Sequence, residues 1–238
     1  MKFLVLDVET SGLPRYDRQA DHPSQPHVAS VSMIFTDEEL AVEKEYYALI
    51  KPTDWEMEPG AMAVNGLTME KLHAEGVPIA DALGIYTAAI LDGRAVGAHN
   101  AQFDVKMMRA ELRRAGMDDL FEKTPNVCTM RATAEVMRIA PTNKMMAAGY
   151  KKFKPPKLLE AYRFLFNRDF PGAHTATGDA MACLEILREL KRNGALPAPE
   201  IHYAKEGTKA GEALKARAEA KEVLQELDRK EIGEAETQ

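Results

Sequence analysis

Short apolar runs alternate with amphipathic segments along the first two hundred residues of the chain. Runs rich in Val, Ile, Leu, Phe or Tyr predict strands, and these runs lie at residues 2–8, 28–35, 45–51, 95–98 and 126–128. The first run is short and unbroken and is followed by a Thr-Ser-Gly sequence, which is typical of a central buried strand. A turn is expected at residues 37–39, and the polar stretch at residues 14–26 predicts a loop.

Helical spacing of apolar residues fills most of the remaining chain. The predicted helices lie at residues 69–74, 80–91, 101–115, 129–139, 157–166 and 173–193. Gly116 and Gly194 can take the left-handed conformation that ends a helix, and Pro141 stops the fourth of these segments. Residues 141–156 are expected to form a loop. Strands that alternate with helices in this way indicate a layered α/β domain.

The composition changes beyond Pro197 and Pro199. Residues 205–238 are rich in Ala, Glu and Lys, and their apolar positions recur every three or four residues, which predicts a charged helix with a thin apolar stripe. This helix would dock on the domain or on a partner, or would stay largely solvated. The sequence therefore predicts a main domain at residues 1–195, with a linker and a C-terminal helical extension at residues 196–238.

The overall composition is that of a globular protein with one sizeable core. The chain has 238 residues, of which 45% are hydrophobic and 29% are charged. Asp7 and Glu9 interrupt the N-terminal apolar run too early for a signal peptide, and no later segment is apolar enough to cross a membrane. Cys128 and Cys183 are too few for a disulfide scaffold and are expected to be core thiols, so a cytoplasmic location is predicted.

Charge is distributed unevenly along the chain. The net charge of −6 argues against a protein that coats nucleic acid by bulk electrostatics. Residues 106–157 nevertheless contain twelve basic and five acidic residues, whereas residues 1–76 contain six basic and fourteen acidic residues. This asymmetry suits an enzyme with an acidic metal centre beside a basic surface for phosphates. A solvated basic face is the alternative interpretation.

Two acidic residues stand at the end of the first predicted strand. Because side chains alternate along a strand, Asp7 and Glu9 point to the same side of the sheet. Two neighbouring anions repel each other, and a divalent cation with a preference for oxygen ligands, such as Mg²⁺ or Mn²⁺, would remove that penalty. Alternatively, Asp7 caps the following turn and Glu9 is solvated.

Two further motifs carry acidic residues next to histidine or asparagine. Asp104 falls in the first turn of a predicted helix, where a carboxylate is favoured by the helix dipole or acts only as a cap. Asp179 follows His174 by five residues, which would place the two about 140° apart on one helix. A shared site therefore requires that His174 precede the helix. Otherwise His174 is a capping residue and Asp179 a surface residue.

Taken together and in this order, the motifs resemble those of the DEDDh exonucleases. This family includes the DNA polymerase III proofreading subunit, exonuclease X, ribonuclease T and oligoribonuclease. The resemblance covers residues 1–193 and rests on DVET at residues 7–10, HNAQFD at residues 99–104 and HTATGD at residues 174–179. The segment KLLEAY at residues 157–162 also looks like the family helix before the third motif. Two departures are Asn65, where many relatives have His, and the basic loop at residues 151–157.

The resemblance implies a ribonuclease H-like fold with a mixed five-stranded sheet flanked by helices. It also implies hydrolysis of nucleic acid from the 3′ end with two divalent ions, Mg²⁺ or Mn²⁺. Asp7 would bridge both ions, Glu9 and Asp179 would complete the site beside the attacking water, and Asp104 would support the second ion. His174 would take the proton of the water.

Substrate contacts follow from the same resemblance. The turn formed by Thr10, Ser11, Gly12 and Leu13 would hold the terminal nucleotide, with Leu13 against the last base. Asn65 would also contact the substrate, and Asn100 and Phe103 would contact the sugar and phosphate, although Phe103 could equally be a core residue. The phosphate backbone of the nucleic acid upstream of the terminal nucleotide would be bound by four lysines, Lys151, Lys152, Lys154 and Lys157.

Several functional alternatives remain at the level of the sequence. Single-stranded DNA is the favoured substrate, in replication, repair or phage DNA metabolism, and RNA trimming by the same mechanism is the close rival. A phosphatase of the haloacid dehalogenase type would use Asp7 as a nucleophile, but it has no use for His174 and Asp179. A catalytically silent module in a polymerase assembly is a third class. A polymerase or a second copy of the chain is a candidate partner for the C-terminal helix.

Overall fold

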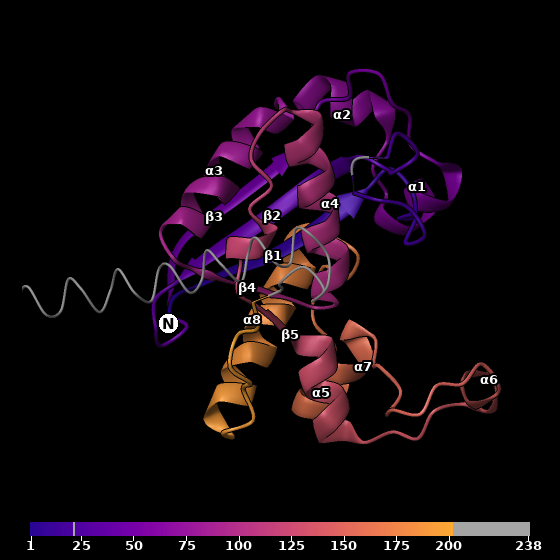
Figure 1. The fold of residues 1–238 in the computed structure, drawn as a ribbon, viewed down its shortest axis with the longest axis vertical. Helices are drawn as coiled ribbons and strands as arrows, with labels where there is room; N and C mark the ends of the chain where they lie inside the picture. The colour runs from indigo at the N-terminus through magenta and orange to yellow at the C-terminus, as the bar shows by residue number, and fades with distance from the viewer. Residues whose placement is uncertain (21, 202–238) are drawn as a thin grey trace, which may run out of the picture. The chain divides into compact units, whose positions relative to one another are not determined.

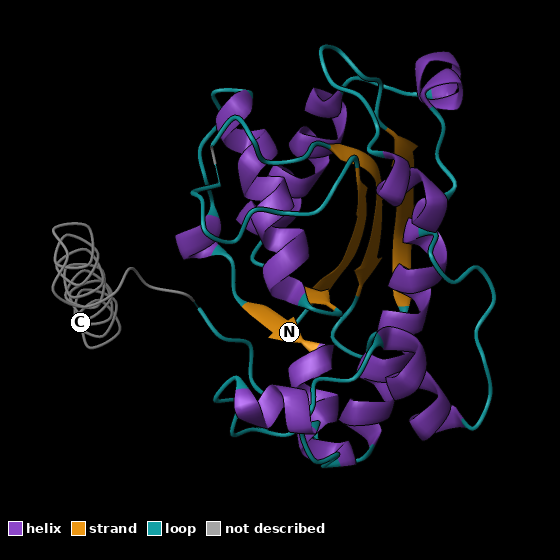
Figure 2. Cartoon of the chain, turned by 90° about the vertical axis from the view of Figure 1, so that its right-hand side faces the viewer, coloured by secondary structure: helices purple, strands orange, loops and turns teal. Residues whose placement is uncertain are grey.

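A computed structural model describes residues 1–20 and 22–201 and contains a mixed five-stranded sheet (Figure 2). The strands are β1 (Phe3–Thr10), β2 (Val28–Thr36), β3 (Val42–Leu49), β4 (Ala95–Ala98) and β5 (Asn126–Cys128). Their order in the sheet is β3-β2-β1-β4-β5. β1 pairs antiparallel with β2 and parallel with β4, so it is central as predicted. The five strands inferred from the apolar runs are confirmed.

The helices agree with the predicted ones, apart from two additions and small shifts of their ends. The α-helices are α1 (Pro59–Asn65), α2 (Met69–Glu75), α3 (Ile79–Leu91), α4 (Ala101–Arg114), α5 (Thr129–Met137), α6 (Asn143–Ala147), α7 (Leu158–Phe166) and α8 (Ala176–Arg192). A 3₁₀ turn, η1, covers Phe121–Lys123. Helices α1 and α6 were not expected, because neither contains a buried residue and both therefore lack an apolar stripe.

The sheet is covered on both faces, as an α/β domain requires. Alternate residues of β1, Leu4, Leu6 and Val8, pack in a cluster with residues of α3 and α4. The intervening residues Phe3 and Val5 pack with α8 instead. The alternation continues to the end of β1, where Asp7 and Glu9 replace apolar residues on the face that α8 covers.

A third cluster joins α5, α7 and α8. It contains the fully buried Tyr162 of α7, whose ring contacts those of Phe166 and Phe170. Figure 1 shows α5 and α7 beside the sheet, whereas α6 stands away from the other helices on its connecting segments. The segment at residues 141–156, expected to be a loop throughout, therefore carries a short exposed helix.

The described chain ends on the sheet. Glu200 pairs with Asn126 of β5 in an isolated antiparallel bridge, and residues 1–200 form one compact unit. The domain boundary expected at residue 195 stays a prediction, and the predicted C-terminal helix lies outside the described residues. No helix within residues 1–20 and 22–201 has the length and apolar character needed to cross a membrane.

Candidate active site

The centre of the candidate site is the last part of β1. Asp7 and Glu9 lie within the strand and are partly buried, and their register partners on β2 are Ser32 and Ser30. Cross-strand partners share one face of a sheet, so two serines lie beside the two carboxylates. Both serines are almost fully buried, which gives this end of the α8-covered face a polar floor.

Asp104 is brought to this centre by the start of α4. Asn100 precedes the helix with a left-handed backbone (φ 70°), a conformation that asparagine tolerates better than most residues. The Oδ1 atom of Asp104 accepts a hydrogen bond of 3.1 Å from the backbone N–H of Val8, between the two acids of β1. Its Oδ2 atom is buried and has no hydrogen-bond partner within the described chain. A buried carboxylate oxygen without a donor is costly, and a bound cation or a proton would remove that cost.

His174 precedes α8, as the shared site requires. Its backbone is left-handed (φ 65°), and its N–H donates a hydrogen bond of 3.2 Å to Oδ1 of Asp179. The helix is capped by Thr175, whose Oγ1 accepts from the N–H of Gly178 at 3.1 Å. His174 is therefore exposed beside Asp179 and is not the capping residue. A Cβ at Gly178 would lie 2.1 Å from the carbonyl oxygen of Gly172, so this tight turn needs a glycine.

Three carboxylates converge at this point. Ligand atoms of Asp7, Glu9 and Asp179 all lie within 4.8 Å of one another, the spacing of a potential metal site. Burial raises the pKa of Asp7 well above its usual value, and the charges of Asp104 and Asp179 raise it further. Burial, followed by the charge of Asp179, raises the pKa of Glu9 to about 7. Burial raises the pKa of Asp104 and of Asp179 as well. The centre thus holds more negative charge than it can stabilise alone.

The turn after β1 is fixed by its own hydrogen bonds. Thr10 donates from Oγ1 to the carbonyl of Gly12 at 2.7 Å, and Oγ of Ser11 accepts from the N–H of His27 at 2.9 Å. Both side chains are buried and engaged within the protein, whereas Leu13 is 80% exposed. Leu13 is therefore free to meet a ligand, whereas the backbone N–H and carbonyl of Ser11 are already bonded to His27 and Glu58.

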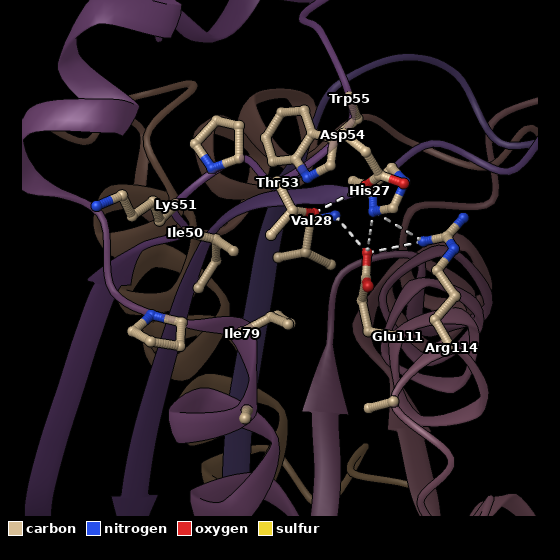
Figure 3. A pocket seen from close by; sticks show the side chains of 14 residues that line it. His27, Val28, Ile50, Lys51, Thr53, Asp54, Trp55, Ile79, Glu111 and Arg114 are labelled. Carbon is tan, nitrogen blue, oxygen red and sulfur yellow. Dashed lines mark hydrogen bonds and ion pairs between the residues drawn. The ribbon is translucent and has the colours of Figure 1, made fainter.

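A buried ion pair between Glu111 and Arg114 lies next to His27, which is bonded to the same turn. Figure 3 shows His27 and Arg114 directed at the carboxylate of Glu111, beside an open cavity of about 630 Å³. Oε1 of Glu111 lies 2.8 Å from Arg114, 3.3 Å from His27 and 3.0 Å from the N–H of Val28. The His27 ring also stacks on Trp55 at 5.4 Å. Because Ser11 bonds to His27, this network holds the turn in place.

The other residues predicted to contact the substrate differ in how exposed they are and in whether their polar groups are already bonded. Asn65 donates from Nδ2 to the carbonyl of Thr10 at 3.3 Å, so it borders the turn. Phe103 packs against the core and is partly buried. Lys151, Lys152 and Lys157 are exposed, but the ammonium of Lys154 is held by Glu160 at 2.6 Å. Their roles as substrate contacts stay predictions.

Some residues beside the centre were missed from the sequence. Ser30 and Ser32 alternate within the apolar β2 strand, a pattern that could have revealed a polar strip facing Asp7 and Glu9. Tyr47 of β3 pairs in register with Ser32 and is 49% exposed. The ring of Tyr16, in the loop after the turn, lies 5.1 Å from the ammonium of Lys106 on α4. No sequence pattern pointed to either tyrosine.

Comparison with known proteins identifies the family. Residues 4–187 match the RNase T family of exonucleases. The chain belongs to this exonuclease family. The resemblance to DEDDh exonucleases and the ribonuclease H-like fold inferred from the motifs are therefore confirmed. A search of curated proteins finds no match.

Solved structures of exonuclease I share the fold of this family member. E. coli exonuclease I in complex with a dT13 oligonucleotide has a TM-score of 0.63 at 20% identity, and the complex with dA16 has 0.62 at 20%. The zinc-bound complex of the same enzyme with single-stranded DNA has 0.61 at 21% identity. Each match covers 80% of this chain. The chain covers only 40–41% of the length of those exonuclease I chains.

Proposed function

We propose that the protein hydrolyses single-stranded DNA from its 3′ end and releases nucleoside 5′-monophosphates. One observation carries the proposal. The clustered carboxylates of Asp7, Glu9 and Asp179 lie beside the buried Asp104, and His174, which precedes α8, donates its backbone N–H to Asp179. Family membership and this constellation support phosphodiester hydrolysis together.

The residues fit a pair of divalent cations. The unpartnered Oδ2 of Asp104 and the raised pKa values of Asp7 and Glu9 are both relieved by positive charge. An all-oxygen donor set favours Mg²⁺ or Mn²⁺ over softer metals. Asp7, Glu9, Asp104 and Asp179 would hold the ions. When bound, the ions supply positive charge to the scissile phosphate and the attacking water.

His174 is the proposed general base. It is exposed beside Asp179, so its imidazole can reach a water above the carboxylates. The neutral ring takes one proton as the water oxygen bonds to phosphorus. The bond from phosphorus to the 3′ oxygen of the upstream nucleotide breaks, and that oxygen gains a proton. The released product then carries a 5′-phosphate.

The substrate assignment rests on the fold and on the exposed turn. The similar exonuclease I structures are complexes with dT13, dA16 or single-stranded DNA. In this chain Leu13 is exposed next to the centre, where it would contact the last base. Asn65 beside the turn, with Asn100 just before α4 and Phe103 on it, would line the terminal nucleotide. Exposed Lys151, Lys152 and Lys157 would bind the upstream backbone, with Lys154 available only if it leaves Glu160.

RNA is the second candidate substrate, because the catalytic groups do not distinguish the two sugars. The haloacid dehalogenase alternative loses its support, since the chain belongs to an exonuclease family. A silent binding module is disfavoured by the presence of all four acids and His174. A cytoplasmic location and a polymerase or homodimer partner stay predictions.

An assay with 5′-labelled oligomers tests the proposal. DNA and RNA of the same sequence are incubated with Mg²⁺, Mn²⁺ or EDTA. We expect DNA to shorten stepwise from the 3′ end with either metal and to stay intact in EDTA. Equal or faster loss of RNA would refute the preference for DNA.

Asp7→Ala should abolish turnover with the fold intact, because the acid at the middle of the cluster is removed. Asp118→Ala is the matched control, since Asp118 is exposed and lies in another part of the chain. Normal turnover by Asp7→Ala, with a control that is also normal, would contradict the assignment of the site.

A further inference from the structure

Tyr16 lies at the edge of the candidate site, on the loop between β1 and β2. Burial raises the pKa of its hydroxyl, the nearby side chain of Asn100, the residue before α4, lowers it, and the charge of Asp104 raises it. Burial contributes most to this rise. The residue as a whole is nevertheless 53% exposed. An aromatic ring is thus open to solvent beside the acidic cluster.

The loop that carries Tyr16 is a braced structure. Gln25 is 2% exposed and its side chain bonds to both the N–H and the carbonyl of Arg15, at 2.9 and 2.8 Å. Its Nε2 also donates to the carbonyl of Gln19 at 2.9 Å. The ammonium of Lys106 donates to the carbonyl of Arg15 at 2.6 Å. These bonds fix the backbone immediately before Tyr16, so the position of the ring is specified.

One side of the ring is already occupied. The ammonium of Lys106 lies 5.1 Å from the ring centroid, within the range of a cation–π contact. Tyr16 therefore lies against the first turns of α4. Asn100, Phe103 and Lys106 follow one another at intervals of three residues on that side of the helix. Within the described chain no second ring or cation is recorded against Tyr16. The exposed area is available to a flat ligand.

We propose that Tyr16 is a further substrate-binding residue, whose ring stacks on a nucleobase of the single strand near the cleaved bond. This inference rests on the proposed exonuclease function. A pre-positioned aromatic ring binds any base through its π face, and the nearby Lys106 adds positive charge that attracts the phosphates. Bases of single-stranded nucleic acid are free to stack in this way, whereas those of a duplex are not.

The test separates the ring from the hydroxyl. Tyr16→Phe keeps the ring and removes the hydroxyl, whereas Tyr16→Ala removes both. Phe164→Ala is the matched control, because Phe164 is 54% exposed on α7. Binding is measured with oligo-dT strands that carry 2-aminopurine, a fluorescent base quenched by stacking, at each of the last four positions. A phosphorothioate at the last linkage slows hydrolysis, and Ca²⁺ replaces Mg²⁺.

We expect the wild type, Tyr16→Phe and Phe164→Ala to quench one position more strongly than the others. Tyr16→Ala should lose that quenching, and its Kd should rise about 5- to 100-fold, the range of a lost base–aromatic stack. In turnover assays KM should rise more than kcat falls. Melting temperatures confirm that the variants are folded.

Two results would overturn the inference. Unchanged quenching and Kd in Tyr16→Ala would exclude stacking, and equal losses in Tyr16→Phe and Tyr16→Ala would assign the effect to the hydroxyl. If the wild type neither binds nor shortens any strand, the proposed function fails as well. If Tyr16→Ala keeps normal turnover, only the proposed stacking role of Tyr16 is refuted, and the proposed exonuclease function is not.

Discussion

Neutralising Glu9 should stabilise the metal-free protein while it destroys the proposed activity. Burial and the charge of Asp179 raise the pKa of Glu9 from 4.5 to about 7. A carboxyl whose pKa is raised by folding favours the folded state below its unfolded pKa, and this contribution is lost as the pH rises through the folded pKa. Above pH 7 the charged form therefore costs the folded state at most about 3 kcal/mol. Glu9→Gln removes this cost.

The magnitude is large enough to measure by thermal unfolding. For a domain of this size 1 kcal/mol corresponds to about 2–4 °C, so Glu9→Gln should raise Tm by up to roughly 6–12 °C at pH 8 in EDTA. The difference should shrink steadily below pH 7 and vanish below about pH 4.5, where the carboxyl is neutral in both the folded and the unfolded state. Saturating Mg²⁺ should stabilise the wild type more than the variant, because a ligand that binds the folded state shifts unfolding.

The matched control is Glu45→Gln, which removes an exposed charge from β3 and should leave Tm nearly unchanged. A Tm for Glu9→Gln that equals or falls below that of the wild type at pH 8 would show that the cluster is not electrostatically frustrated. The same conclusion would follow if the difference did not depend on pH. In either case the argument that cations complete the site would lose its physical basis.

Three further perturbations test other parts of the site. His174→Ala should lower kcat by about 10²–10⁴ with Mg²⁺-induced stabilisation retained, and an unchanged rate at neutral pH would exclude it as the base. Gly178→Ala forces a Cβ toward the carbonyl of Gly172 and should cost about 1–3 kcal/mol and most of the activity. Its control, Gly84→Ala in α3, meets nothing within 4 Å and should be neutral or stabilising, so equal Tm values for the two would contradict the close approach. Glu111→Gln removes the charge that faces Arg114 and should cost on the order of 1–3 kcal/mol in urea unfolding, together with a raised KM through the Ser11 turn. Exposed Glu122→Gln should change neither, and a KM for Glu111→Gln equal to that of the wild type would separate the network from the turn.

Local patterns were sufficient for most of the elements and for the positions of Asp7, Glu9 and His174 within them. The unbroken run of β1 predicted a central strand, and its two-residue period placed Asp7 and Glu9 on one side. Helical geometry alone required His174 to stand before α8, and it does. These inferences succeeded because each depends on neighbours within a few residues. The same reasoning missed α1 and α6, which lack buried residues and so leave no amphipathic pattern.

Only the tertiary structure brought distant segments together. The bond from Val8 to Asp104 spans 96 residues, and the bond from Val28 to Glu111 that supports the Ser11 turn spans 83. Tyr16 meets Lys106 of α4 from a loop that a buried glutamine braces. Such contacts depend on the directions of side chains across the packed sheet and helices. The sequence determined which groups were available, and packing decided which of them meet.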